Sequence, residues 1–341
     1  MKPRLLYIIG AQRSGTTLLE RILSSHSMIH GGAEPHILTP LAHLGIWRKV
    51  EKAPYDTIVS ALGQQAFVDN LPNREEDYWQ ACRAYCDVLY TQHMENSNKQ
   101  LCLDKTPEYA TVLPFITKVF PDAKYIVLTR HPVAVFSSFA NSFFDGNYTL
   151  AQQHEPLLER YIPPIAAFLR QTKIAFLHVH YEDLVKNPES EIQRICQYLE
   201  LPYESESLAY QKQSKQPTSS LQPGDPLGVQ RFQGPSELSL TKWTTELKRN
   251  QSNYQFMQKL IKKLDPADLK TLGYPIDTLW QAMNIPISDT KVHAKPKFKF
   301  NRYQLERKLI IKGRAVVRRF PRLSPILKRI RLICDVLLRE L

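Results

Sequence analysis

The sequence contains few cysteines and no long apolar run, and each of these two shortages excludes a class of protein. Glycine is also infrequent. The 341 residues include five cysteines and 12 glycines. No C-x-x-C pair occurs, so neither a zinc site nor a disulfide framework is expected, and we predict reduced cysteines and a cytoplasmic setting. No stretch approaches the roughly 20 apolar residues of a membrane span, and the run at 5–9 is too short for a signal sequence.

Positive charge is concentrated in one terminal segment. The chain has a net charge of +12 and 43% hydrophobic residues, enough for a packed core. Residues 291–341 hold 16 Lys or Arg and three Asp or Glu, whereas residues 1–290 hold 29 and 30. A neutral body argues against nucleic acid as a partner. We therefore expect a folded domain over 1–290 and a basic C-terminal tail over 291–341.

The tail carries an apolar stripe at helical spacing. The stripe consists of Ile326, Ile330, Ile333, Leu337 and Leu341. This pattern predicts an amphipathic helix, which could pack on the core, bind a partner protein or lie on a membrane. The cations favour an anionic membrane surface, since each gains about 1 kcal/mol near an anionic leaflet. We expect peripheral association at the inner membrane surface.

Short apolar runs alternate with helical patterns along the body. The runs 5–10, 101–105, 124–130 and 174–181 read as buried parallel strands. Helices are predicted over 16–26, 76–95, 110–120, 133–143, 151–171 and 188–200. This alternation indicates an α/β fold in three layers, with a central parallel sheet flanked by helices. The polar segment 211–239 is either a flexible linker or a lid over a ligand.

A glycine-containing loop joins the first strand to the first helix. The segment Gly10-Ala11-Gln12-Arg13-Ser14-Gly15-Thr16-Thr17 has the spacing of a phosphate-binding P-loop, except that Thr16 stands where an NTPase has lysine. Unpaired amides and the positive end of the helix dipole favour an oxyanion there. Without that lysine a triphosphate is poorly matched, whereas Arg13 can bind a second anionic group beside the first phosphate.

The run from Gln12 to Thr17 resembles the 5′-phosphosulfate loop of sulfotransferases that use 3′-phosphoadenosine 5′-phosphosulfate (PAPS), in the form found in tyrosylprotein and many bacterial enzymes. The resemblance extends over about residues 4–247. It implies a P-loop-like fold and transfer of the sulfuryl group of PAPS to an acceptor hydroxyl on a glycan, lipid or small molecule. The residues it assigns to the donor's 5′ end are Arg13, Ser14, Gly15, Thr16 and Thr17.

Later segments, in the same order, extend this resemblance to the rest of the nucleotide. Arg130 and Ser138 occupy the positions that bind the 3′-phosphate in the family, and Tyr181, in a Tyr-Glu-Asp-Leu run, would lie against the adenine. A looser similarity near the end of the domain implies that Lys242, and less clearly Arg231, returns a cation to the nucleotide.

Two further residues resemble the family's reacting groups. Glu34 lies 21 residues after Arg13, where tyrosylprotein sulfotransferases carry a catalytic glutamate that removes the acceptor's proton. Lys105, at the end of a strand, would stabilise charge on the sulfuryl group, with Asp104 to orient it. His30 and His36 are alternative bases.

The predicted reaction is an in-line displacement that releases adenosine 3′,5′-bisphosphate. Glu34, Arg13 and Lys105 form the catalytic set, and no metal is expected because the cations neutralise the developing charge. Two alternatives remain open. One is a P-loop kinase acting on a small hydroxyl compound, and the other is a non-catalytic, membrane-tethered nucleotide-binding module.

Overall fold

A computed structural model describes residues 4–32, 34–35, 37–42, 57–212 and 238–284, together with Gly313 and Phe320. Almost all of the tail 291–341, the segment 213–237 that contains Arg231, and His36 lie outside the described residues. The predictions made for them therefore stay predictions. No helix in the described part of the chain is long and apolar enough to cross a membrane.

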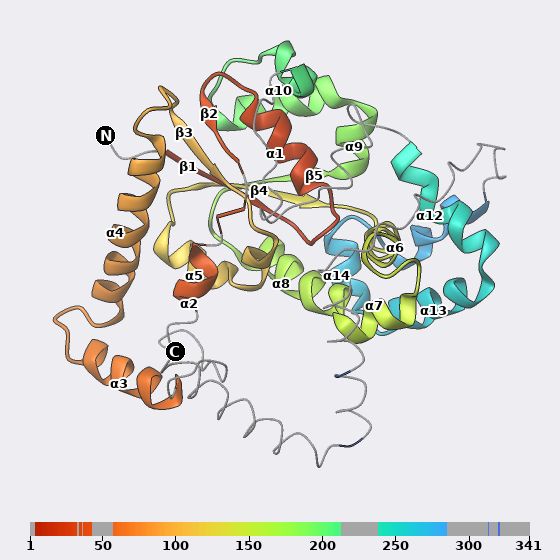
Figure 1. Ribbon diagram of the computed structural model, residues 1–341, viewed down its shortest axis with the longest axis horizontal. Coiled ribbons are helices and arrows are strands. Elements are labelled where there is room, and N and C mark those ends of the chain that lie inside the picture. The colour runs from red at the N-terminus through yellow and green to blue at the C-terminus, as the bar shows by residue number, and fades with distance from the viewer. Residues whose placement is uncertain are drawn as a thin grey trace, which may run out of the picture.

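A five-stranded parallel sheet forms the centre of the molecule, as the sequence predicts (Figure 1). Its strand order is β2-β3-β1-β4-β5. The strands are β1 (Arg4–Ile9), β2 (Ile29–His30), β3 (Leu101–Asp104), β4 (Lys124–Thr129) and β5 (Phe176–His180). The central strand β1 pairs with β3 on one side and β4 on the other. Because the strands are parallel, their carboxyl ends lie at one edge, where ligands of such sheets bind.

Helices cover both faces of this sheet (Figure 1). Their bounds are α1 Thr16–Ser24, α2 Leu38–Ala42, α3 Thr57–Asp69, α4 Glu75–Met94, η1 Pro107–Thr111, α5 Leu113–Val119, α6 Pro132–Phe143, α7 Tyr148–His154, α8 Leu157–Gln171, α9 Tyr181–Lys186, α10 Pro188–Leu199, η2 Ser205–Lys212, α12 Leu238–Arg249, α13 Gln251–Ile261, α14 Pro266–Thr271, α15 Ile276–Leu279 and η3 Gln281–Asn284.

Alternation along β1 divides the core into two layers. Leu6 and Ile8 pack with the apolar residues of α1, α9 and α10. Tyr7 and Ile9 point to the opposite face and pack with those of α4, α5, α6 and α8. Successive side chains of a strand face opposite ways, so a buried parallel strand must be apolar throughout. This requirement explains why the strands were visible in the sequence as unbroken apolar runs.

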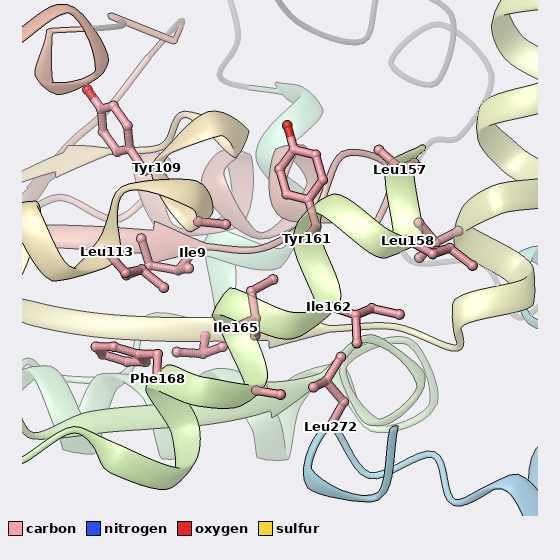
Figure 2. Close-up of a cluster of buried hydrophobic side chains, with 14 of the residues drawn as sticks. Ile9, Tyr109, Leu113, Leu157, Leu158, Tyr161, Ile162, Ile165, Phe168 and Leu272 are labelled. Carbon is pink, nitrogen blue, oxygen red and sulfur yellow. The ribbon is translucent and has the colours of Figure 1, made fainter. Parts of the chain in front are cut away.

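Helix α8 packs on the face of the sheet to which Tyr7 and Ile9 point, next to the carboxyl ends of β1 and β4. Figure 2 shows Ile162 and Ile165 of α8 turned toward Ile9 of β1 and Leu272 after α14, and all four side chains are buried. Each fully buried side chain of this kind contributes about 1.5–3 kcal/mol relative to an exposed one. The edge that carries the site is thus held by a rigid, closely packed layer.

Each predicted strand overlaps a strand of the structure and four of the six predicted helices overlap one helix each, whereas α2, α3, α9 and α12–α15 were not predicted. The helix predicted over 151–171 is two helices, α7 and α8, because Glu155 and Pro156 between them take extended or irregular backbone angles. The helix predicted over 110–120 is likewise a 3₁₀ turn, η1, followed by α5. The short edge strand β2 was not predicted, since its two residues carry no periodic signal. Among the described residues Cys82, Cys86, Cys102 and Cys196 are free and buried.

Candidate active site

The loop between β1 and α1 is shaped by two residues with left-handed backbone angles. Arg13 has φ +68° and Gly15 has φ +98°. Ser14 closes the turn, since its hydroxyl donates a 2.7 Å hydrogen bond to the carbonyl of Ala11. Helix α1 then begins without a side-chain cap at Gly15. Its first amide groups therefore have no side-chain acceptor at the cap position, as an anion-binding helix N-terminus requires.

Glycine is required at both ends of this loop. A Cβ on Gly15 would lie 2.3 Å from Cδ2 of Tyr181, and one on Gly10 would lie 2.7 Å from the carbonyl oxygen of Leu128. The methyl group of Thr16 would also meet such a Cβ on Gly10, and Thr16 is 4% exposed. The residue in the NTPase lysine position thus packs inside the turn, and the aromatic ring of Tyr181 covers the loop's backbone.

Arg130, delivered by the end of β4, lies partly buried beside the loop. Its guanidinium stacks on the ring of Tyr181, 4.2 Å from the centroid. It donates hydrogen bonds to the main-chain carbonyls of Arg13 (3.1 Å) and Ser239 (2.8 Å). Burial lowers the pKa of Arg130, and the charge of Arg13 lowers it further, although Tyr181 and Glu182 act in the opposite direction. Within the described residues the buried Nε of Arg130 has no hydrogen-bond partner.

Arg13 connects the loop to helix α6. Its Nε donates a 3.2 Å hydrogen bond to the hydroxyl of Ser138, 125 residues away in the sequence. Its guanidinium also lies 5.8 Å from the ring centroid of Phe143, at the end of the same helix. The two residues assigned to opposite ends of the nucleotide therefore meet directly, and with Arg130 they form a compact cationic half of the site.

Glu34 and Lys105 form an ion pair on the other side of the loop. Lys105 follows β3 and is 3% exposed, while the Glu34 side chain is 11% exposed. The ammonium of Lys105 donates to Oε1 of Glu34 and, at 3.4 Å, to the hydroxyl of Thr17 in the first turn of α1. A carboxylate and a lysine are thus brought together at the edge of the loop, where a base and a charge-stabilising group can act on one reacting centre.

Other predicted residues lie elsewhere. Asp104 does not orient Lys105, because its carboxylate accepts hydrogen bonds from Tyr90 (2.6 Å) and Tyr109 (3.0 Å) on the opposite face of β3. The ring of His30 lies against His93 of α4, with 3.0 Å between their Nε2 atoms. Lys242 of α12 is 59% exposed and lies 3.8 Å from Glu246, so its role at the nucleotide stays a prediction.

The family follows from a match along the chain. A model described as the sulfotransferase family matches residues 4–205, which include the loop, Glu34, Lys105, Arg130, Ser138 and Tyr181. The chain belongs to the sulfotransferase family.

Individual relatives of this chain are distant. Nodulation protein NoeE of Sinorhizobium fredii is 27% identical over 218 residues, 57% of this chain and 49% of NoeE. A putative protein-tyrosine sulfotransferase of Caenorhabditis briggsae is 28% identical over 209 residues, 60% of this chain and 68% of that protein. A solved sulfotransferase domain from the curacin biosynthetic pathway is 25% identical, with 71% of this chain and 91% of that chain covered and a TM-score of 0.48. The chain thus spans about half the length of NoeE.

Two residues that lie beside the candidate site were not predicted from the sequence. The Ser239 hydroxyl lies 2.8 Å from the hydroxyl of Tyr181, and its carbonyl accepts from Arg130, so α12 is attached to the cationic half. Glu20, on α1, is 7% exposed beside the ion pair of Glu34 and Lys105. A carboxylate inside the apolar pattern of a helix was the signal for Glu20, whereas nothing in the sequence pointed to Ser239.

Proposed function

We propose that this protein transfers the sulfuryl group of PAPS to an acceptor hydroxyl. The observation that carries the proposal is the contact of Lys105 with both Glu34 and Thr17, at the edge of the phosphate loop. This contact joins a base, a cation and the start of α1 at one point. The membership of the sulfotransferase family supports the same chemistry.

The cationic half fits a nucleotide with two separated anionic ends. Arg13 and the amides at the start of α1 would hold the 5′-phosphosulfate. The buried, unpartnered Nε of Arg130 is a donor aimed at no acceptor among the described residues, which suits a 3′-phosphate held together with Ser138. The ring of Tyr181 offers a flat face, although it is already stacked on Arg130.

The proposed reaction needs three actions from the chain. Glu34 takes the proton of the acceptor hydroxyl as the acceptor oxygen forms its bond to sulfur. Lys105 and Arg13 stabilise the negative charge that develops as the bond between sulfur and the phosphate oxygen breaks. Adenosine 3′,5′-bisphosphate leaves with the electron pair of that bond. The acceptor is a hydroxyl compound.

A titration and a transfer assay test the proposal together. We expect adenosine 3′,5′-bisphosphate to bind at least tenfold more tightly than adenosine monophosphate, because the 3′-phosphate gains charged hydrogen bonds worth about 1.5–3 kcal/mol. Radiolabelled sulfate from PAPS should then appear on members of a panel of phenols, sterols and glycans. Equal binding of the two nucleotides, or tighter binding of Mg-ATP than of the bisphosphate, would overturn it.

A further inference from the structure

Glu20 has a buried carboxylate that takes no part in the reaction proposed above. It lies on α1 one turn after Thr17 and is 7% exposed. Residues three apart on a helix share a face, so Glu20 and Thr17 point to the same side of α1. Lys105 already donates to Thr17 on that side. Glu20 therefore belongs to the surface of α1 that faces the reacting pair.

The carboxylate of Glu20 is held in place by its own helix. The hydroxyl of Ser24 donates a 3.0 Å hydrogen bond to Oε1 of Glu20. Ser24 in turn occupies the space beside Gly31, where a Cβ would lie 2.1 Å from its hydroxyl oxygen. Gly31 follows β2 and lies three residues before Glu34. Absence of a side chain at Gly31 thus allows α1 to pack against the segment that carries the proposed base.

The charged side chains that act on Glu20 include Lys105 and Glu34, which are the two groups proposed to act on the reacting centre. Burial raises the pKa of Glu20, and among nearby charges Lys105 has the largest opposing effect. Arg21 also lowers the pKa, while Glu34 raises it. Lys105 thus acts electrostatically on Glu20 and forms an ion pair with Glu34. An isolated buried charge costs several kcal/mol, so a buried ammonium needs an anionic partner at every stage of a reaction.

The anionic partner of Lys105 changes during the proposed reaction. Once Glu34 has taken the acceptor's proton it is neutral and no longer balances the ammonium. A second carboxylate in the same buried cluster would hold the ammonium in place while its other anionic contact passes from Glu34 to the leaving bisphosphate. Resting on the proposed function, we propose that Glu20 is a positioning residue that holds Lys105 between Thr17 and the reacting centre while Glu34 carries the proton.

The first test measures turnover and its pH dependence. Glu20→Gln keeps the shape of the side chain and an acceptor for Ser24 but removes the charge. We expect kcat to fall about tenfold to 100-fold while KM for PAPS changes less than threefold, because a misplaced group affects the reaction more than binding. The pH profile of kcat should shift to lower pH on both limbs, since a negative charge beside Glu34 and Lys105 has been removed. Ser24→Ala should shift it less, in the same direction.

A matched variant separates this effect from loss of a buried charge in general. Asp268→Asn removes a carboxylate that is 6% exposed and paired with Arg170 on α8, away from the loop. It should lower the melting temperature without moving the pH profile. An unchanged kcat and pH profile in Glu20→Gln, with the wild-type chain active, would assign Glu20 a structural role and overturn the inference.

A second measurement does not depend on turnover. The carboxyl carbon of Glu20, labelled with ¹³C and assigned with Glu20→Gln, can be titrated by NMR in the wild-type chain and in Lys105→Met. Loss of the lysine should raise the pKa of Glu20, because an opposite charge has been removed. An unchanged titration overturns the coupling. If the pKa of Glu20 rises in Lys105→Met but the wild-type chain shows no PAPS turnover, the coupling of Glu20 to Lys105 stands and the proposed function is rejected.

Discussion

The two halves of the candidate active site differ in the charged side chains that they bring together. The nucleotide half, consisting of Arg13, Arg130, Ser138 and Tyr181, gathers two guanidinium groups against an aromatic ring and main-chain carbonyls. The reacting half, consisting of Glu20, Glu34 and Lys105, places a lysine among carboxylates. Two guanidinium groups held close together favour a bound anion, whereas a cluster of one lysine and two carboxylates can accept and release a proton. The contrast separates binding from chemistry within one edge of the sheet.

The packing beneath the two halves differs as well. Both use carboxyl ends of parallel strands, but the nucleotide half follows β4 and β5 and is fastened to α12 by Ser239. The reacting half follows β2 and β3 and is fastened to α1 by Thr17 and Ser24. The loop between β1 and α1 contributes Arg13 to one half and Thr17 to the other. Substitutions on either side of this loop should therefore separate binding from turnover.

Removing the charge of Glu34 should give the largest effect. In Glu34→Gln we expect turnover of PAPS to fall by about 10²–10⁴-fold, the contribution typical of a general base. Affinity for adenosine 3′,5′-bisphosphate should stay within about threefold, because Glu34 lies in the reacting half. Rapid-quench transfer and calorimetric titration measure the two quantities. Glu95→Gln, at an exposed position after α4, is the control, and an undiminished rate in Glu34→Gln would exclude Glu34 as the base.

The converse substitution in the nucleotide half should act on binding. Arg130→Ala should weaken adenosine 3′,5′-bisphosphate by about tenfold to 100-fold, because a charged hydrogen bond contributes about 1.5–3 kcal/mol. Affinity for adenosine monophosphate, which lacks the 3′-phosphate, should change much less, and a comparison of the two titrations checks this. Arg160→Ala removes an arginine from a surface ion pair with Glu155 and should change neither. Equal weakening of both nucleotides would contradict the assignment of Arg130 to the 3′-phosphate.

The sequence could predict the sheet because buried parallel strands must be apolar on both faces. The predicted runs at 5–10, 101–105 and 124–130 each lie within one residue of β1, β3 and β4. The helix predicted over 151–171 was wrong because the apolar pattern continues across Pro156, where the backbone breaks. Local pattern identifies an element, but a break inside a periodic run depends on the backbone angles that the surrounding packing selects.

The site was predictable only where motifs lie at strand ends. Lys105, Arg130 and Tyr181 each lie at the end of a predicted strand, so their common edge follows from a parallel sheet, whereas Glu34 follows β2, which was not predicted. The contact between Arg13 and Ser138 spans 125 residues and required the fold. Asp104 was given a role at Lys105, yet neighbouring residues of a strand face opposite ways, and its partners are Tyr90 and Tyr109.

A methyl group at Gly15 should disturb both halves moderately. In Gly15→Ala the new Cβ would lie 2.3 Å from Cδ2 of Tyr181. The alanine would also have to keep a φ of +98°, which an L residue rarely adopts. We expect a loss of about 1–3 kcal/mol in the free energy of unfolding and weaker bisphosphate binding. Denaturant unfolding and calorimetry measure these effects. Gly32→Ala is the control, because a Cβ there would meet nothing within 4 Å, and similar losses in both variants would show that the loop is not specially constrained.

The smallest expected effect concerns protonation behind the nucleotide half. Burial lowers the pKa of His178 on β5 to about 4, and His180 and Arg194 add to the effect. Its Nε2 lies 2.9 Å from the hydroxyl of Thr129, the residue before Arg130. The unfolded chain takes up this proton near pH 6.5 but the folded chain does not, so stability is fully present above pH 6.5 and falls as the pH drops toward 4.

Replacement of His178 should therefore flatten the acid side of the stability profile. In His178→Asn we expect about 1–2 kcal/mol less loss of unfolding free energy between pH 6.5 and 4, a figure reduced for partial exposure of the ring. Part of the slope should remain, since burial also lowers the pKa of His131. His30→Asn, in the histidine pair beside the reacting half, should flatten the slope less, because the ring of His30 is less buried than that of His178. Equal flattening in both variants would show that His178, behind the nucleotide half, contributes no more to the acid side of the stability profile than His30.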